Sequence, residues 1–279
     1  MRRYLAFALV LLAAGTAQAA EKRLDRTFTV SPGGSLMVEA DGASVHVSGS
    51  DANQVVVHML TRGSEQNLAD TELDAVQKGS DVTVTMRKSK RGWFAFGNWS
   101  SEQDIQVTVP RNFVVNVHTS GGSVDLQNTV GVASLKSSGG DLSAKNVTGA
   151  VELKTSGGSI HAESIRGDVD ANTSGGDVRL AGVDGKIRGR SSGGSLRFTL
   201  VGANRGISAT TSGGDIELKL PQGTRGNLEA TTSGGQVESD LPVTSSGRVE
   251  DSRLVGTLNG GGEPIYARTS GGSISVRAN

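Results

Sequence analysis

The sequence contains no cysteine, which excludes a disulfide framework and any metal site built on thiolates. The four histidines also lack the spacing of metal ligands. They are His46, His58, His118 and His161. Isolated aspartates such as Asp141, Asp168 and Asp177 are expected to be solvated rather than to hold Ca²⁺. We therefore predict no metal and no cofactor.

Neither sign of charge dominates, since 28 basic residues face 28 acidic ones. This balance gives no support to nucleic acid as a partner. Long apolar runs are also missing beyond the first 20 residues, so no membrane-spanning segment is expected there.

The N-terminus has the three parts of a secretory signal. Arg2 and Arg3 precede an apolar run at 5–14, and Ala17-Gln18-Ala19 resembles a cleavage site. We predict that residues 1–20 are a signal peptide and that the protein is periplasmic, cell-surface or secreted. No cysteine follows the cleavage site, so a lipid anchor is not expected.

Glycine is abundant, with 40 residues, but it shows no three-residue period and therefore does not indicate collagen. Its positions follow a longer period instead. Four consecutive phrases of 18 residues fill residues 119–190: TSGGSVDLQNTVGVASLK, SSGGDLSAKNVTGAVELK, TSGGSIHAESIRGDVDAN and TSGGDVRLAGVDGKIRGR. A fixed period of this length indicates stacked supersecondary units.

Each phrase predicts two strands joined by two corners. Apolar residues stand two apart at positions 2 and 4 after the Gly pair and again at 11 and 13, as in strands with one buried face. A further glycine at position 9 marks a corner, where positive φ is tolerated. Coils of equal length can stack, so that each strand pairs in parallel with its copies. The sequence thus predicts an all-β fold, a parallel β-solenoid (β-helix) of ~18-residue coils.

Position 1 of the phrase supports this stacking independently. It alternates between serine and aspartate in the order Ser123, Asp141, Ser159, Asp177, Ser195 and Asp215. Alternation would keep carboxylates two coils apart, which reduces repulsion if these residues form a column. The threonines and serines that begin the phrases are expected to form hydrogen bonds along a ladder, and an exposed hydroxyl array could bind glycans.

We predict a single domain over 21–279, in which an irregular N-terminal part (21–110) precedes the repeat coils (111–279). The irregular part should contain a short helix capped by Ser64 and a hairpin turning near Gly79, and should cover the N-terminal end of the stack. A strand near 54–60 is expected to be buried on both faces. The last phrase, at 269–276, has no capping element after it, so self-assembly through an uncapped C-terminal coil is one hypothesis.

The TSGG phrases behind a signal peptide resemble a bacterial family of exported β-strand-repeat proteins, whose domain bears the label "putative adhesin" and is otherwise of unknown function. The resemblance covers roughly residues 33–278, ending with TSGGSISV at 269–276. It implies a β-solenoid at the cell envelope. It carries no catalytic motif to this chain.

One segment, at 87–99, departs from the repeat by gathering cations and aromatic residues. Such a loop could bind a partner protein, contact a membrane surface, or fold back as a plug over the core. Its candidate partner-binding residues are Arg87, Lys88, Lys90, Arg91, Trp93, Phe94, Phe96 and Trp99.

No constellation of catalytic residues emerges from the sequence. The SGG corners lack the lysine and the following helix of a phosphate-binding loop. We predict a non-catalytic cell-envelope scaffold with an adhesin, binding or structural role, whose partner is an envelope protein, a glycan or a membrane surface. A β-helix enzyme acting on polysaccharides is the alternative, and it requires a cleft where arginines and carboxylates converge. The sequence also leaves open that the protein forms a homo-oligomer.

Overall fold

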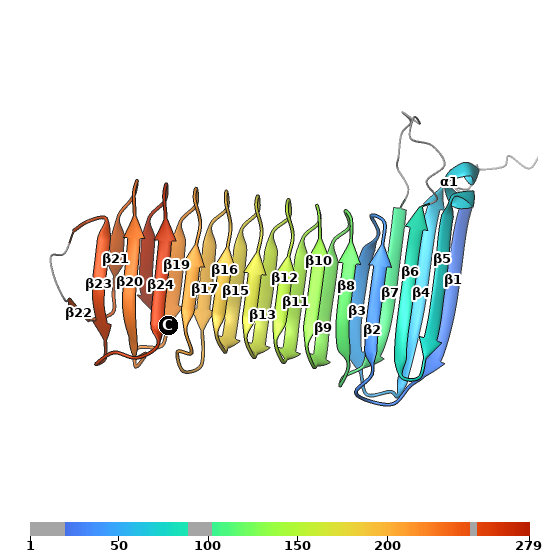
Figure 1. The fold of residues 1–279 in the computed structure, drawn as a ribbon, viewed down its shortest axis with the longest axis horizontal. Helices are drawn as coiled ribbons and strands as arrows, with labels where there is room; N and C mark the ends of the chain where they lie inside the picture. Colours follow the sequence, from blue (N-terminus) through green and yellow to red (C-terminus); the bar gives the residue numbers. More distant parts are fainter. Residues whose placement is uncertain (1–19, 89–101, 246–249) are drawn as a thin grey trace, which may run out of the picture.

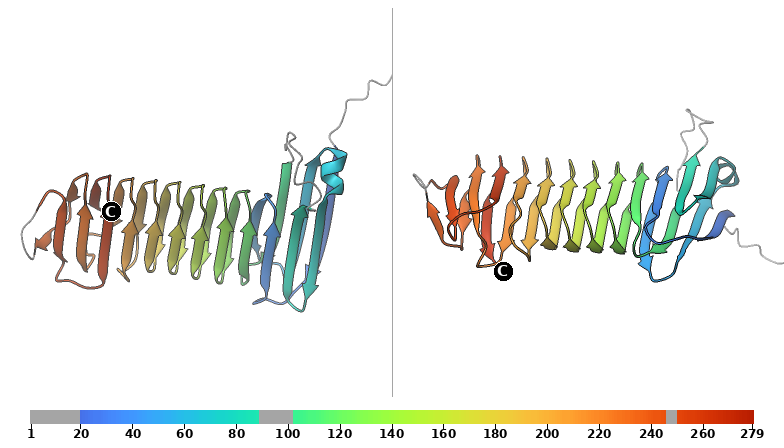
Figure 2. Two further views of the ribbon diagram at one scale, coloured as in Figure 1. Left: turned by 45° about the horizontal axis from the view of Figure 1, so that its top comes forward. Right: turned by 60° about the horizontal axis from the view of Figure 1, so that its bottom comes forward.

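The computed structural model describes residues 20–88, 102–245 and 250–279. Two long sheets form an extended two-layer stack (Figures 1 and 2). One contiguous apolar core runs between them. The described residues include one short helix, α1 (Glu65–Ala69), and none long and apolar enough to cross a membrane. The signal-peptide prediction concerns residues 1–20, nearly all of which lie outside the described part.

The strands follow one another in space in an order that differs from the chain order at both ends. The first sheet has the order β1 (Ala20–Thr29), β4 (Gln54–Gly63), β7 (Glu102–Pro110), β3 (Ser44–Ser50), β9 (Val124–Val130), β11 (Leu142–Thr148), β13 (Ile160–Arg166), β15 (Val178–Asp184), β17 (Leu196–Leu200), β19 (Ile216–Leu220), β25 (Ile274–Ala278), β21 (Val237–Ser239). The second has the order β22 (Val243–Ser245), β23 (Arg253–Leu258), β20 (Gly226–Thr232), β24 (Pro264–Thr269), β18 (Ile207–Thr210), β16 (Ile187–Arg190), β14 (Val169–Asn172), β12 (Val151–Lys154), β10 (Ala133–Ser137), β8 (Val114–Thr119), β2 (Ser35–Ala40), β6 (Asp81–Lys88), β5 (Thr71–Lys78).

The middle of the molecule is a stack of parallel coils, each giving one strand to either sheet. Leu126 pairs with Ala144, Ala144 with Ala162, and Ala162 with Leu180. All four side chains are fully buried, so they form one interior file. The prediction of parallel strands stacked at the 18-residue period is therefore confirmed.

At one level of the stack the core places a large side chain on one sheet against a glycine on the other. Phe198 continues the interior file next to Leu180, and its ring lies against Gly189 of the opposite sheet. A β-carbon on Gly189 would overlap the ring of Phe198. Close packing of this kind leaves little room for a change of volume on either side.

The threonines and serines that open the phrases are buried and form hydrogen bonds from coil to coil, as expected, so the alternative of an exposed hydroxyl array is wrong. The Thr155 hydroxyl donates to the carbonyl of Gly140, one coil earlier, at 2.9 Å. It also accepts the N–H of Gly158 in its own corner, at 3.4 Å. The same pattern recurs at Thr173 and Ser191. These hydroxyls tie each corner to the one before it, because a buried polar group must find a partner.

The alternating serine and aspartate residues do form a column along the stack. Each side chain accepts a hydrogen bond from the backbone N–H of the next member. Asp141 Oδ1 accepts from Ser159 at 2.7 Å, and Ser159 Oγ accepts from Asp177 at 3.3 Å. The column thus satisfies corner donors in addition to separating carboxylates.

The coils contain a third buried column that the repeat pattern did not predict. Val147, Ile165 and Val183 are buried at position 7. The preceding residue is left-handed in each coil, as at Asn146 with φ of 54°. This bend turns the end of the strand inward and brings position 7 into the core.

The N-terminal part extends both sheets with further strands. β1 pairs antiparallel with β4, and β5 pairs antiparallel with β6. Ser64 accepts the N–H of Asn67 at the start of α1, which lies beside β1, β4 and β5. β4 is buried on one face only, with Val55 and Val57 inside and His58 outside, so the prediction of two buried faces is wrong.

The C-terminal coil is inserted into the stack. β24 lies between β18 and β20, and β25 lies between β19 and β21, all in parallel. Residues 226–245 and 250–258 therefore form the outer end of the molecule although they precede this coil in the chain (Figure 1). The prediction of an uncapped C-terminal coil is wrong, and self-assembly through it loses its basis.

Candidate functional site

The loop predicted from sequence as a partner-binding site lies almost wholly outside the described residues. Lys90, Arg91, Trp93, Phe94, Phe96 and Trp99 all belong to the undescribed segment. Arg87 and Lys88 end strand β6. Arg87 forms an ion pair with Glu39, and the Lys88 N–H donates to Asp41 at 3.0 Å. These two contacts join the end of β6 to strand β2 and to the corner that follows it.

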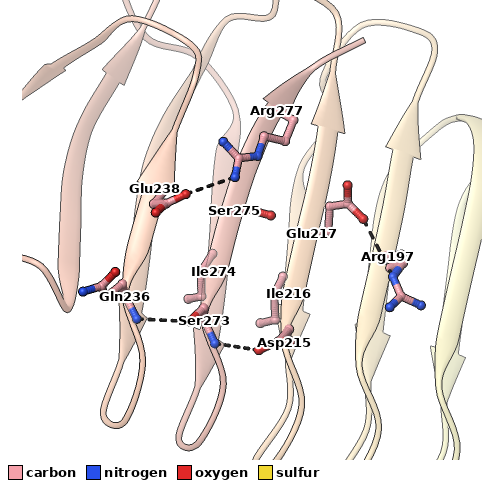
Figure 3. Close-up of a pocket in the computed structure, with 10 residues that line it drawn as sticks. All are labelled: Arg197, Asp215, Ile216, Glu217, Gln236, Glu238, Ser273, Ile274, Ser275 and Arg277. Atoms are coloured by element: carbon pink, nitrogen blue, oxygen red, sulfur yellow. Dashed lines mark hydrogen bonds and ion pairs between the residues drawn. The ribbon is translucent and has the colours of Figure 1, made fainter.

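The structure reveals a different site, a polar hollow on the outer face of the first sheet (Figure 3). Its volume is about 270 Å³, and strands β17, β19, β25 and β21 with their preceding corners form it. We call it the serine hollow. It is lined by Arg197, Asp215, Ile216, Glu217, Gln236, Glu238, Ser273, Ile274, Ser275 and Arg277.

The hollow exists because the inserted strand carries a small residue between two long ones. Glu217, Ser275 and Glu238 lie in register on three neighbouring strands. Neighbouring strands are roughly 4.8 Å apart, so the two glutamates stand about 10 Å from each other with Ser275 between them. Ser275 has no side-chain hydrogen-bond partner among the described residues, so its hydroxyl is open to a ligand.

Arginines balance the carboxylates around the hollow. Arg277 contacts Asp240 at 2.6 Å and Glu238 at 3.0 Å, and the hydrogen bond with Asp240 raises the pKa of Arg277. Arg197 lies 3.8 Å from Glu217. On the floor, Asp215 accepts the Ser273 N–H at 2.8 Å. The site therefore offers fixed donors and acceptors with little net charge.

This arrangement suits hydrogen bonding better than catalysis. No histidine lines the hollow to activate Ser275. Glu217 and Glu238 are 31% and 59% exposed and ion-paired, so neither is in the apolar surroundings that keep a general acid protonated. No group of three or more histidine, aspartate or glutamate side chains is placed to hold a metal within the described ranges.

A second hollow, of about 450 Å³, lies where the longer corners of the stack meet. It is lined by segments 202–204, 221–225 and 261–263. Asn204 donates to the carbonyls of Arg225 and Glu263, which fixes these turns to one another. Four of its residues are glycines, so it offers few side chains for recognition.

The largest pKa shift in the described residues belongs to Glu152, on the outer face of the second sheet. Hydrogen bonds from Lys154 and then from Ser134 lower the pKa of Glu152 to about 2, and Lys136 lies 3.3 Å away. This cluster is a network of ion pairs on the neighbouring strands β10 and β12, not a cleft.

Sequence reasoning missed the serine hollow because its residues come from phrases that are not neighbours in the chain. Glu217 and Ser275 meet only through the insertion of β25. The alternation of serine and aspartate is the one sequence signal that points to this order, since Ser273 follows Asp215 in the column.

The family comparison matches residues 34–277 to Toastrack DUF4097. The match spans most of the chain, so the chain belongs to this family. No curated protein matches the sequence.

Three solved structures match the chain over most of its length. A "putative adhesin" from Bacteroides fragilis is 12% identical, covers 92% of this chain and 97% of its own, and has a TM-score of 0.50. A "putative adhesin" from Parabacteroides distasonis is 12% identical, covers 92% of this chain and 97% of its own, and has a TM-score of 0.42. A "putative lipid binding protein" from the same species is 12% identical, covers 92% of this chain and 96% of its own, and has a TM-score of 0.40. At such identity the first of these supports the fold alone.

Proposed function

We propose that this Toastrack DUF4097 chain is an exported, non-catalytic scaffold of the cell envelope that binds an uncharged glycan in the serine hollow. The observation that carries the proposal is Ser275 standing open between the ion-paired Glu217 and Glu238. A sugar offers many hydroxyls that both donate and accept, which matches carboxylates, guanidinium groups and a serine fixed at short spacing.

Rigidity favours the same role. Apart from the corner residues Asp215, Gln236 and Ser273, the side chains of the hollow stand on strands, and all of these strands except the outer strand β21 are hydrogen-bonded on both sides. Groups held on regular strands lose little conformational freedom on binding, so a weak set of contacts can still select a ligand. The charge balance of the hollow favours a neutral ligand over an ionic one.

An envelope location rests on two observations. Residues 1–20 have the pattern of a signal peptide. The similar fold from Bacteroides fragilis belongs to a protein named a "putative adhesin", which is consistent with a contact role. Cleavage after Ala19 or Ala20 in the purified exported protein, read by N-terminal sequencing, tests the first of these.

Filling the hollow tests the binding proposal. In Ser275→Trp the indole would occupy the space between Glu217 and Glu238, so binding on an array of neutral glycans should be lost. Ser143→Trp is the matched control, because Ser143 lies in the same column on β11 without a hollow around it. Equal glycan binding by both variants, or no binding by the native chain, would exclude the hollow as a glycan site.

The convergence of arginines and carboxylates in the hollow also supports a second candidate function, cleavage of a polysaccharide. Glu217→Gln and Glu238→Gln distinguish the two. An enzyme would lose turnover of its glycan in both variants while retaining binding. A binding scaffold releases no reducing ends from any glycan that it retains, in the native chain or in the variants.

A further inference from the structure

The outer face of the second sheet carries a row of residues that contains no acid. Nine neighbouring strands each contribute one residue, in register with the next. We call it the basic row. It consists of His118, Lys136, Lys154, Asn172, Arg190, Thr210, Arg268, Thr231 and Arg253. At the usual strand spacing the row is about 40 Å long.

The acids of this face stand in the adjacent row, two residues away along each strand. Glu152 pairs with Lys136 and Lys154, and Glu229 lies 3.8 Å from Arg253. These contacts compensate the two ends of the basic row. They do not reach its centre.

The central cations, Arg190 and Arg268, have no ion pair among the described residues. Both side chains are exposed. They stand on either side of Thr210, which is in register with both. Two strand spacings place their backbones about 10 Å apart. In the adjacent row, the acid on the strand next to Arg190 is Asp170, which lies 4.0 Å from Arg188. The acid on the strand next to Arg268 is Glu229, which lies 3.8 Å from Arg253. The centre of the row is thus a pair of uncompensated guanidinium groups with a hydroxyl between them.

The first sheet has no equivalent row. One of its outer columns reads Ser143, His161, Arg179 and Arg197 and then reaches an acid at Glu217, and in another Lys145 is in register with Glu163. The absence of acids over nine strands is therefore a property of one line on one face.

We propose that the basic row binds a single extended chain of an acidic polysaccharide, whose carboxylates contact Arg190 and Arg268. Guanidinium groups hold carboxylates through paired, charge-assisted hydrogen bonds. Thr210 and Asn172 offer partners to the sugar hydroxyls between the charged groups. This site lies on the opposite sheet from the serine hollow and does not depend on it.

The shape of the row argues for this ligand over other polyanions. The row is one residue wide and acids lie along one side of it, so a broad anionic surface such as a membrane would meet Glu152, Asp170 and Glu229 as well. Single-stranded nucleic acid is usually held by aromatic side chains on which its bases stack, and the basic row contains none. A narrow chain of carboxylates fits both features.

Binding of the mature chain to alginate, a linear polyuronate, tests the proposal by biolayer interferometry. The native chain should bind alginate, should release it as salt rises, and should not bind neutral dextran. Arg190→Ser together with Arg268→Ser should weaken binding by at least about tenfold. The control, Arg166→Ser together with Arg179→Ser, removes the same charge from the first sheet and should bind as the native chain does.

Several outcomes would overturn the assignment. No binding of alginate by the native chain, or equal losses in the two double variants, would remove the basic row as a site. Tighter binding to oligo(dT) or to phosphatidylglycerol vesicles than to alginate would contradict the ligand class. Ser275→Trp should leave alginate binding unchanged. The proposal for the basic row and the proposal for the serine hollow can therefore fail independently of each other. Circular dichroism melts of each variant verify the fold.

Discussion

Asp215 and Ser273 are direct neighbours in the stack, with Asp215 Oδ1 accepting the Ser273 N–H at 2.8 Å, although 58 residues separate them in the chain. Ser273 Oγ in turn accepts the N–H of Gln236 at 3.3 Å. The coil formed by 264–278 therefore lies between two coils that precede it in sequence. This insertion joins the outer end of the molecule, residues 226–245 and 250–258, to the repeat coils.

Removal of the inserted coil should uncouple that outer end. β20 pairs with β23 and β24, and β21 pairs with β25, so neither pairs with β18 or β19. A chain ending at Gly262 should show fast hydrogen exchange over 226–258, while 114–190 stays protected.

A synthetic peptide of residues 263–279 should restore protection when added to the truncated chain. The same peptide with Ile274→Asp is the control, because it would bury a charge at a fully buried position. Protection of 226–258 in the truncated chain without any peptide would show that the inserted coil is dispensable.

Gly189→Ala should destabilise the fold. Its methyl group would overlap the ring of Phe198, and overpacking of a filled core costs about 1–3 kcal/mol. Urea titration measures the free energy of unfolding. Gly223→Ala is the control, since nothing lies near its added β-carbon. Combining Gly189→Ala with Phe198→Leu should recover part of the loss, whereas simple additivity would mean that the two residues do not interact.

Thr155→Val should also destabilise the fold, because it keeps the shape but removes the hydroxyl that joins two corners. Leaving the Gly140 carbonyl without this donor in a buried corner costs about 1–3 kcal/mol. Thr199→Val, on the outer face, is the control. Equal stability of the two variants in urea would mean that the corner hydroxyls do not join the coils.

Glu152 should make a small, pH-dependent contribution to stability. Its folded-state pKa of about 2 is below the ordinary value of 4.5, so the contribution is present above pH 4.5 and is lost as pH falls toward 2. Solvent screens this exposed cluster, so the contribution is below about 1 kcal/mol. The difference in unfolding free energy between the native chain and Glu152→Gln should shrink over that range. Glu72→Gln, at a residue without an ion pair in the described part, is the control.

The repeat made the middle of the fold predictable, because the period fixes which residues stack. Leu126 and Ala144 could be paired from spacing alone. The buried position of Val147 could not, since it depends on a left-handed residue, Asn146, inside a strand. Asparagine is also common in ordinary turns, so its presence does not distinguish a bend inside a strand from a turn that ends the strand.

The ends and the candidate site were harder to predict because they depend on chain order in space. If the last phrase in the sequence is taken as the last coil of the stack, its strand is predicted to be an exposed edge. In the structure that strand, β25, has a neighbouring strand on each side. The serine hollow follows from that insertion. The column of alternating serine and aspartate contained the information, since Ser273 continues the alternation after Asp215 and Gln236 does not.

Cross-linking tests the inserted coil most directly, because the chain has no cysteine of its own. Glu217 and Ser275 lie in register on adjacent strands, so Glu217→Cys with Ser275→Cys places the two Cα atoms about 4.8 Å apart, within reach of a disulfide. Glu217→Cys with Glu238→Cys places them about 10 Å apart, too far to bridge. We predict an intramolecular disulfide by mass spectrometry in the first variant and none in the second. A disulfide in the second variant alone would show coils stacked in chain order and would contradict the inserted coil.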